Sequence, residues 1–223
     1  KNFQVRINDR RILKAMAAYA DFPESDYDNI FITLDKMDKI GIDGVSRELQ
    51  ETGYAAEMVE KYMSLFTDLE TAEDGVAYLG DKLGEALPAG VADNMSTIMN
   101  SVKAGASAQF DLVFDPTLVR GMSYYTCSIF EIKMAEMSGS VGGGGRYDEM
   151  IGKFTGQNTP ACGFSIGFER IVTILMEQGF QIPGAAQKKA YLLEKGMSSE
   201  QMISVLAEAK AETVEVKDLY ILL

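Results

Sequence analysis

The 223-residue chain contains no histidine, the side chain that most often serves as a general base or as a zinc ligand. Its two cysteines, Cys127 and Cys162, lack the spacing of metal ligands, which favours a reduced, cytoplasmic location and no bound structural metal. No apolar run approaches the roughly 20 residues that span a bilayer, so we expect no membrane partner. Chemistry must therefore use Arg, Asp, Glu, Tyr or a metal that arrives with a nucleotide.

Basic residues are scarce in the middle of the chain. Residues 21–110 hold 18 acidic and 6 basic side chains, which accounts for the whole net charge of −12. The remainder is balanced, with 15 of each sign. This break in composition predicts a separate module with a solvated acidic surface. It also argues against extensive binding of a phosphate backbone by that module.

The same region has the periodicity of helices. Between residues 26 and 105, apolar stripes of about 10 to 14 residues are separated by helix-stopping residues such as Gly41, Gly53 and Pro88. The Met and Phe side chains on these stripes are expected to form a core. The pattern predicts a small all-α module.

Strand patterns lie on both sides of this module. Residues 3–8 alternate apolar and polar side chains, which predicts an antiparallel strand with one solvent-exposed face, and Asn8 or Asp9 can cap the helix that follows. After the module, FDLVFDP and SYYTCSIFEIKM have strand composition, and CGFSI leads directly into a helix that ends at Gly179. Beyond a linker, residues 188–223 read as strand, helix and strand.

Two stretches of this second part combine cations with glycines. RGMSYYTCSIFEI places Arg120, Tyr124 and Tyr125 at the start of a strand, and VGGGGRYDEM follows with a glycine run and Arg146. Glycines within a strand weaken it and often mark close approach of a ligand, although a flexible hairpin would look the same. Arg170 lies in the first turn of a helix, against the helix dipole, which suggests an anion site or a surface salt bridge. Together, these residues predict a site for a polyphosphate and a small polar molecule.

These stretches resemble the histidyl-tRNA synthetase family of class II aminoacyl-tRNA synthetases. LVRGMSYYTCSIFE is similar to the histidine-binding signature of the family, and GGGRYDEMIG to its glycine-rich strand and turn. PACGFSIGFERIVTIL resembles motif 3. RINDRRIL and LDKMDKIGIDGVSRELQETG are similar to the segment between motifs 2 and 3.

The resemblance implies an α+β fold with the antiparallel sheet of class II synthetases, flanked by helices. We expect the catalytic domain to occupy residues 1–25 and 106–180, the latter with the histidine-binding and motif 3 parts. Residues 26–105 would be an all-α insertion, and residues 181–223 a partial α/β anticodon-binding domain.

The resemblance also implies an activity and a set of site residues. The family activates histidine with ATP and Mg²⁺ and transfers it to tRNA(His), and the intact protein is expected to be a homodimer. Arg120 matches the catalytic arginine that contacts the α-phosphate and the histidine carboxylate. The other matched positions are Tyr124, Tyr125, Gly143 and Gly144 for histidine and Gly145, Gly167 and Arg170 for ATP.

Some features depart from the family pattern. Ser123 stands where many members carry Asp, and Cys127 where Gly is frequent. The sequence contains neither motif 1 nor motif 2, so we expect this chain alone to be inactive. The alternative interpretation is the related regulatory subunit of ATP phosphoribosyltransferase, which keeps the fold without aminoacylation, and a synthetase-like fragment with another binding role is a third.

Overall fold

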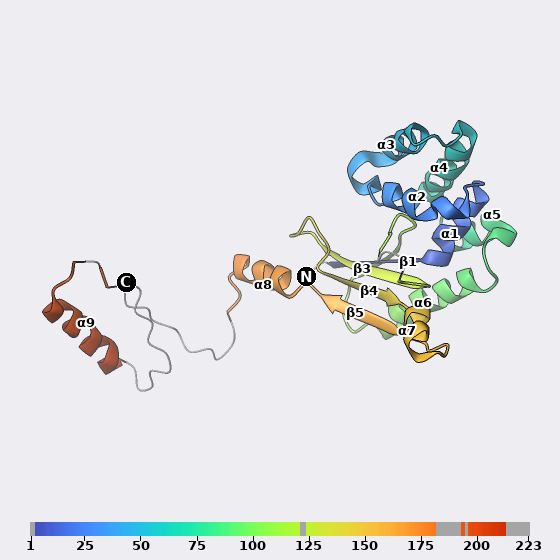
Figure 1. Cartoon of the computed structure of the whole chain (residues 1–223). Helices are drawn as coiled ribbons and strands as arrows, with labels where there is room; N and C mark the ends of the chain where they lie inside the picture. Colours follow the sequence, from blue (N-terminus) through green and yellow to red (C-terminus); the bar gives the residue numbers. More distant parts are fainter. Residues whose placement is uncertain (1–2, 121–123, 182–192, 195, 213–223) are drawn as a thin grey trace. The chain divides into compact units, whose positions relative to one another are not determined.

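A computed structural model describes residues 3–120, 124–181, 193–194 and 196–212. The chain forms two compact units, Lys1–Gln178 and Gly179–Leu223, and each is described by itself. The first unit is a mixed sheet flanked by helices (Figure 1), which confirms the α+β prediction. No helix in the described residues is long and apolar enough to cross a membrane.

The sheet of the first unit has five strands in the order β2-β1-β3-β4-β5. All neighbouring pairs are antiparallel except β1 and β2, which are parallel. This exception follows from the connection, because the chain between these two strands is long enough for the crossover that parallel strands need. The strands are β1 (Phe3–Asp9), β2 (Asp111–Phe114), β3 (Ser128–Met134), β4 (Gly142–Arg146) and β5 (Cys162–Ile166).

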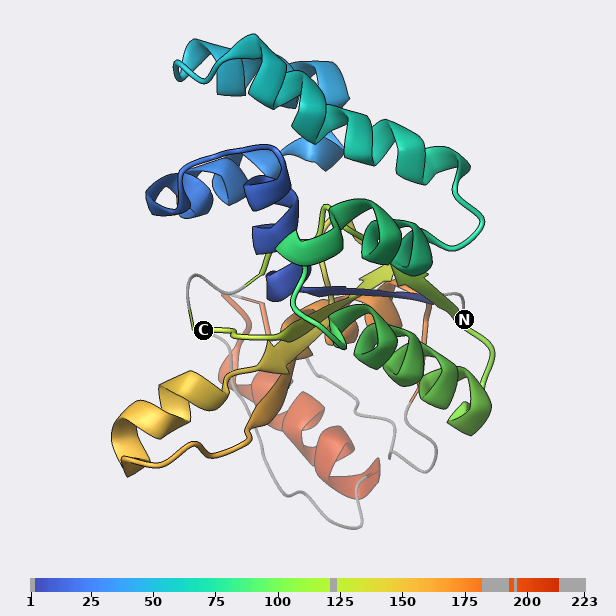
Figure 2. The same ribbon diagram turned by 90° about the vertical axis from the view of Figure 1, so that its right-hand side faces the viewer.

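The helix α1 (Arg10–Tyr19) begins directly at the end of β1. The Asp9 side chain accepts a hydrogen bond from the backbone N–H of Arg11, so Asp9 is the N-cap, one of the two residues predicted for this role. Ile12, Leu13 and Met16 of α1 are buried. Figure 2 shows α1 extending from the sheet into the layer of helices above it.

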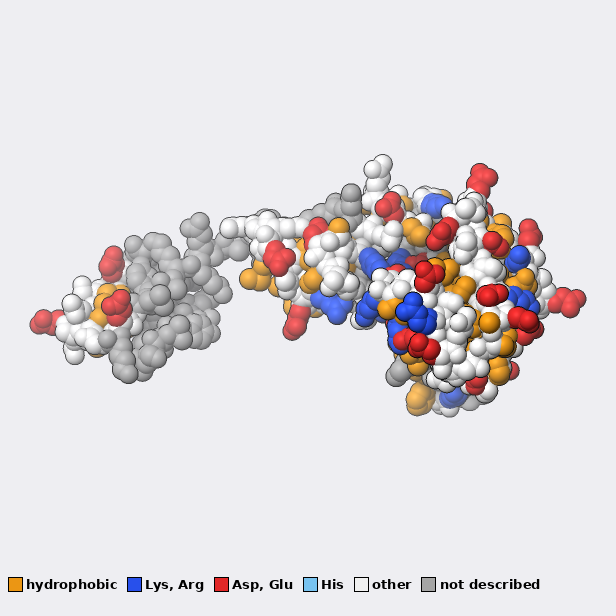
Figure 3. Space-filling view, turned by 90° about the horizontal axis from the view of Figure 1, so that it is seen from above, with side chains coloured by type: hydrophobic (Ala, Val, Ile, Leu, Met, Phe, Trp, Pro, Cys, Tyr) orange, Lys and Arg blue, Asp and Glu red, His pale blue; other side chains and the backbone are white. Residues whose placement is uncertain are grey.

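The predicted helices of the acidic region are present as five α-helices and two short 3₁₀ turns. Gly41 lies inside α3 with φ 68° and ψ 177°, a backbone conformation that interrupts the helix at the predicted stop. Acidic side chains are spread over much of the surface in Figure 3. The elements are the turns Glu24–Asp26 and Gly84–Ala86 and helices α2 (Tyr27–Leu34), α3 (Met37–Glu51), α4 (Ala56–Thr71), α5 (Gly75–Leu83) and α6 (Val91–Gly105).

The hydrophobic core does not stop at the edge of the acidic region. One cluster of buried side chains runs from α1 through helices α2 to α5 and reaches Leu118, Tyr125 and Ile129 near the sheet. Met95 of α6 packs with Ile7 of β1 in a second cluster. The helices of the acidic region thus share buried contacts with α1 and the sheet, and these contacts contribute to holding the helices in place. The domain boundaries at residues 26 and 105 stay predictions.

The prediction of a solvent-exposed face on β1 is wrong. Arg6 is only 7% exposed and Asn8 is fully buried. Both polar side chains find partners in the segment after β2: Arg6 binds Asp115, and Asn8 Nδ2 donates to the carbonyl of Leu118 at 3.1 Å. The alternation correctly predicted that Arg6 and Asn8 share one face of β1. It could not show that the segment after β2 covers this face.

Two helices complete the first unit, α7 (Asp148–Thr155) and α8 (Phe168–Glu177). In the second unit, α9 (Ser199–Glu212) confirms the predicted helix. At the start of α9, Ser198 and Gln201 exchange hydrogen bonds between side chain and backbone, which is a capping box. Two predicted strands lie outside the described residues, the one at 213–223 and the one at 188–194. Only residues 193 and 194 of the second are described.

Candidate functional site

The glycine strand β4 is crossed on one face by two side chains of the predicted site. A Cβ at Gly143 would lie 2.6 Å from Cζ of Arg120, and one at Gly145 would lie 2.8 Å from Cδ1 of Tyr125. Because alternate residues of a strand share a face, Arg120 and Tyr125 lie over the same side of the sheet. The two stretches singled out in the sequence are therefore packed against each other.

On the opposite face of β4, close neighbours leave no room for side chains at Gly142 and Gly144. A Cβ at Gly144 would overlap the backbone carbonyl of Gly163 in β5. A Cβ at Gly142 would lie 3.2 Å from the Phe164 ring, which stacks on Phe130 with centroids 5.8 Å apart. These glycines serve packing between strands, so Gly144 supports the site through the sheet rather than through direct approach of a ligand.

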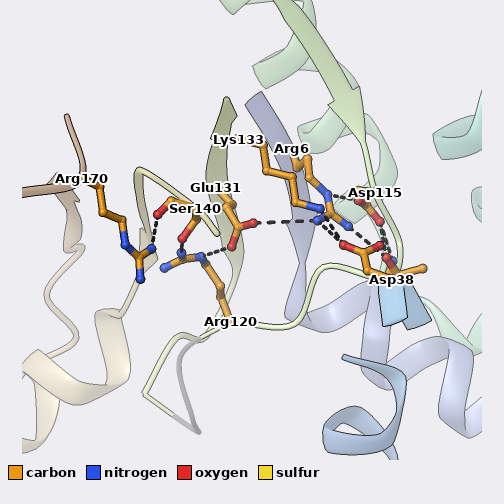
Figure 4. Close-up of polar contacts among 9 residues, drawn as sticks. Arg6, Asp38, Asp115, Arg120, Glu131, Lys133, Ser140 and Arg170 are labelled. Carbon is orange, nitrogen blue, oxygen red and sulfur yellow. Dashed lines mark hydrogen bonds and ion pairs between the residues drawn. The ribbon is translucent and has the colours of Figure 1, made fainter. Parts of the chain in front are cut away.

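Arg120 is held in place by hydrogen bonds from two of its three nitrogens. Its Nε donates to Glu131 Oε2 at 2.8 Å and its Nη2 donates to Ser140 Oγ at 2.6 Å (Figure 4). Glu131 lies on β3, directly opposite Gly143 in the strand register. Among the described residues, no hydrogen bond occupies Arg120 Nη1. The guanidinium is thus oriented by protein groups while donors remain for a ligand.

Arg170, in the first turn of α8, approaches the same place from the other side. Its Nη1 donates to the backbone carbonyl of Ser140, as Figure 4 shows. It forms no salt bridge with any described residue, so the surface ion pair considered from the sequence is not present there. Cβ atoms at Gly139 and Gly167 would lie 3.2 and 3.4 Å from atoms of Arg170. Arg120 and Arg170 therefore converge on one serine, where an anion would relieve their mutual repulsion.

The paired tyrosines lie next to this convergence. Tyr125 is buried and Tyr124 is 42% exposed, and their ring centroids are 4.2 Å apart. Burial and then the hydrogen bond with Tyr124 raise the pKa of Tyr125 to about 12, so its phenol stays neutral at physiological pH. Both residues precede β3, which begins at Ser128, although strand composition had predicted a strand from residue 123. The aromatic residues pack in the loop instead of continuing the ladder.

Arg146 does not join the other two arginines. Its side chain is exposed, and its Nε donates to Asp148 Oδ2 at 2.7 Å. Asp148 also accepts from the backbone N–H of Ala161. Against the effect of burial, these hydrogen bonds lower the pKa of the Asp148 carboxyl. Arg146 thus fixes the start of α7, and because it alternates with Gly145 along β4, it lies on the strand face opposite Arg120 and Tyr125.

Three further residues of the site were not identified from the sequence. Glu131 could have been found, because the alternation in SIFEIKM puts it with Lys133 on the polar face of β3. Tyr147, whose hydroxyl lies against Gly163, was visible as the residue after the glycine strand. Ser140 gave no signal, since its part depends on the fold of the turn between β3 and β4.

The site residues lie over the glycine strand of the sheet. Two surface hollows of about 560 and 500 Å³ lie elsewhere, around residues 103–112 and 80–93, and neither is lined by the predicted site residues. In the described part of the chain, no group of three or more acidic or cysteine side chains could hold a metal ion. The two arginines that meet at Ser140 supply hydrogen-bond donors that suit an anion.

Known protein sequences match this chain over most of its length. A sequence model of the family "Histidyl-tRNA synthetase" matches residues 1–171. The chain belongs to the histidyl-tRNA synthetase family. Histidine–tRNA ligase of Leifsonia xyli subsp. xyli is 43% identical over 181 residues, covering 78% of this chain and 41% of the relative. That of Korarchaeum cryptofilum is 36% identical over 189 residues, covering 80% and 40%.

Solved structures share the fold. Histidyl-tRNA synthetase from Nostoc sp. PCC 7120 matches with a TM-score of 0.67 at 24% identity, covering 94% of this chain and 50% of that one. An "ATP phosphoribosyltransferase regulatory subunit/histidyl-tRNA synthetase" from Bacillus halodurans matches with 0.64 at 20% identity, covering 95% and 51%. The chain spans about two fifths of the length of the curated relatives named above.

Proposed function

We propose that the full-length protein containing this chain is a histidine–tRNA ligase. In its first step the histidine carboxylate attacks the α-phosphorus of ATP, a bond to pyrophosphate breaks, and histidyl-adenylate forms. In its second step a ribose hydroxyl at the 3′ end of tRNA(His) attacks the carbonyl, and AMP leaves. The observation that carries the proposal is the convergence of Arg120 and Arg170 on Ser140.

Arg120 is proposed as the catalytic residue of the first step. Negative charge builds on the phosphoryl oxygens as the carboxylate attacks, and a guanidinium already fixed by Glu131 and Ser140 needs little reorganisation to stabilise it. No histidine is needed, because the step requires electrostatic stabilisation rather than a protein base. Arg170 is proposed to bind the outer phosphates of ATP, with Gly145 and Gly167 beside the nucleotide.

Tyr124 and Tyr125 are proposed to recognise the imidazole ring of the substrate. A neutral phenol can donate to one ring nitrogen or accept from the other, and the pKa of about 12 keeps Tyr125 in this form. Gly143 is proposed to leave room for histidine beside Arg120, and Gly144 is proposed to support this place by letting β4 and β5 pack closely. Because Tyr125 is buried and Tyr124 is exposed, we propose that Tyr125 contacts the ring from the wall of the pocket and Tyr124 from its rim.

The residues present fit ATP better than they fit a resident metal. Two arginines supply donors for phosphates, whereas the described residues offer no cluster of metal ligands. Mg²⁺ is therefore proposed to arrive with ATP, held mainly by the phosphates, and to neutralise part of their charge.

The proposal extends to the partners of the intact protein. We propose a cytoplasmic homodimer that binds tRNA(His). The acidic segment offers few cations for this contact: Lys36 pairs with Glu48 and Lys61 pairs with Asp21, at 2.8 and 2.7 Å. Contact between these helices and the tRNA would thus be local, with most phosphate contacts made elsewhere in the protein.

The test is histidine-dependent exchange of pyrophosphate into ATP by the full-length protein, followed by charging of tRNA(His). We expect exchange with histidine and none with other amino acids. Absence of exchange, together with stimulation of an added ATP phosphoribosyltransferase catalytic subunit, would support the alternative of a regulatory subunit. The curated relatives, which carry the ligase name at 36–43% identity, favour the enzyme.

A further inference from the structure

Arg6 of β1 lies in the same row of the sheet as the candidate site. The strand register pairs Arg6 with Glu131 on β3, and Glu131 in turn with Gly143 on β4. Glu131 is therefore the cross-strand neighbour of a buried arginine on one side and the partner of Arg120 on the other (Figure 4). The family's motifs, as matched here, assign no role to Arg6.

The carboxylate of Glu131 is divided between the two arginines. Its Oε2 accepts from Arg120 Nε at 2.8 Å, and its Oε1 lies 3.8 Å from Arg6 Nη1. The Glu131 side chain is 13% exposed, so water screens these charges weakly. Each arginine consequently limits how the carboxylate can approach the other.

Arg6 cannot easily leave this position. Its three nitrogens also contact Asp115 after β2, Thr117 at 3.2 Å and Asp38 of α3 at 3.0 Å. Asp38 accepts in addition from Lys133 of β3 at 2.6 Å. The contact with Asp38 ties the arginine to the acidic helical segment.

We propose that Arg6 is a positioning residue that sets the orientation of Arg120 through Glu131, an inference that rests on the proposed function of Arg120. Arg6 engages one carboxylate oxygen, so Glu131 offers Arg120 a single oxygen. Without Arg6, Glu131 is free to bind Arg120 with both oxygens, the geometry that arginine and carboxylate prefer. That would draw the guanidinium away from Ser140 and occupy the donors that the substrate needs.

The test compares variants of the full-length protein by steady-state pyrophosphate exchange. For Arg6→Gln we expect kcat to fall about 10-fold with little change in the KM for histidine, since transition-state stabilisation is lost. The loss should disappear when Arg120→Ala is already present, because residues that act as a unit are not additive. Asp38→Asn, a milder change, should lower kcat about 3-fold, because it removes the negative charge of one partner of Arg6.

Two controls separate positioning from general destabilisation. Arg10 is also a buried arginine, and it pairs with Asp28 of α2 without contacting Glu131. Asp43 is exposed on α3 and has no ion pair among the described residues. Arg10→Gln and Asp43→Asn should leave kcat within about 2-fold. Equal losses in Arg6→Gln and Arg10→Gln, or a loss that persists in the Arg120→Ala background, would overturn the proposal.

A second readout does not depend on activity. In a crystal structure of the Arg6→Gln protein, the Arg120 Nη2 to Ser140 Oγ distance, 2.6 Å here, should lengthen while Glu131 binds Arg120 with both oxygens. An unchanged Arg120 would refute the proposal even if exchange is slow. If Arg6→Gln does not fold, Asp38→Asn carries the same structural comparison. Failure of the wild-type protein to catalyse exchange would instead refute the proposed function and leave the crystal comparison to decide the role of Arg6.

Discussion

The helical side of the first unit and its β5–α8 side differ in how far their apolar side chains are exposed to solvent. Around α1 to α5, large side chains such as Phe31, Tyr62 and Leu65 are almost completely buried. On β5 and α8, Ile166 and Phe168 are 61% and 75% exposed. Burial of apolar surface is the main stabilising term in folding, and most of the buried apolar side chains of this unit lie on its helical side. The β5–α8 side presents the kind of apolar surface that marks interaction sites.

The largest expected effect is a contrast in stability between these two sides. Leu65→Ala removes a fully buried side chain from the helical core and should lower the free energy of unfolding by about 2–5 kcal/mol. Phe168→Ala should change it by less than about 0.5 kcal/mol, because most of that ring is already in solvent. Urea unfolding of this chain measures both, and comparable losses would remove the distinction.

Two adjacent glycines give the next contrast. Gly144→Ala would press a methyl group against the backbone of Gly163 and should destabilise the sheet by about 1–3 kcal/mol. Gly143→Ala meets the end of the Arg120 side chain, which can move, so stability should be nearly kept while pyrophosphate exchange by the full-length protein falls. Unfolding and exchange measured on both variants test this, and a reversed pattern would show that Arg120 is not the neighbour that matters.

The smallest expected effect concerns the exposed surface itself. A double variant, Ile166→Ser with Phe168→Ser, should reduce fluorescence of a bound apolar dye by about half if the dye follows exposed apolar area. Ile32→Ser on α2 is the matched control, since Ile32 is an exposed apolar side chain on the helical side. An equal reduction in the control would mean that the dye does not distinguish the two sides.

Periodicity predicted the local structure of this protein well. The helices of the acidic region, the Asp9 cap and the passage from β5 into α8 all follow from patterns of a few residues. Pairing between distant strands was not predictable in the same way. The parallel pair of β1 and β2 and the burial of Arg6 depend on where the chain returns after about a hundred residues.

The candidate site likewise contains residues that sequence motifs predicted and residues that only the fold brings to it. The motif residues Arg120, Tyr125 and Gly143 were predicted, and the structure brings them together. Ser140, on which the arginines converge, and Arg6, which shares Glu131 with Arg120, belong to no motif. Their contributions come from register and turn geometry, which a linear pattern does not contain. Arg146 shows the opposite case, because it follows the glycines in sequence but its side chain pairs with Asp148 at the start of α7.

The most direct test of the central claim is Arg120→Ala in the full-length protein, with Arg146→Ala as the matched control. Both arginines are bound to a carboxylate, but only Arg120 faces the glycine strand and Ser140. For Arg120→Ala we expect kcat of histidine-dependent pyrophosphate exchange to fall at least ~100-fold, with a much smaller change in the KM for histidine. For Arg146→Ala we expect nearly wild-type kcat. A loss for Arg120→Ala that is confined to KM, or an equal loss of kcat in both variants, would contradict the account.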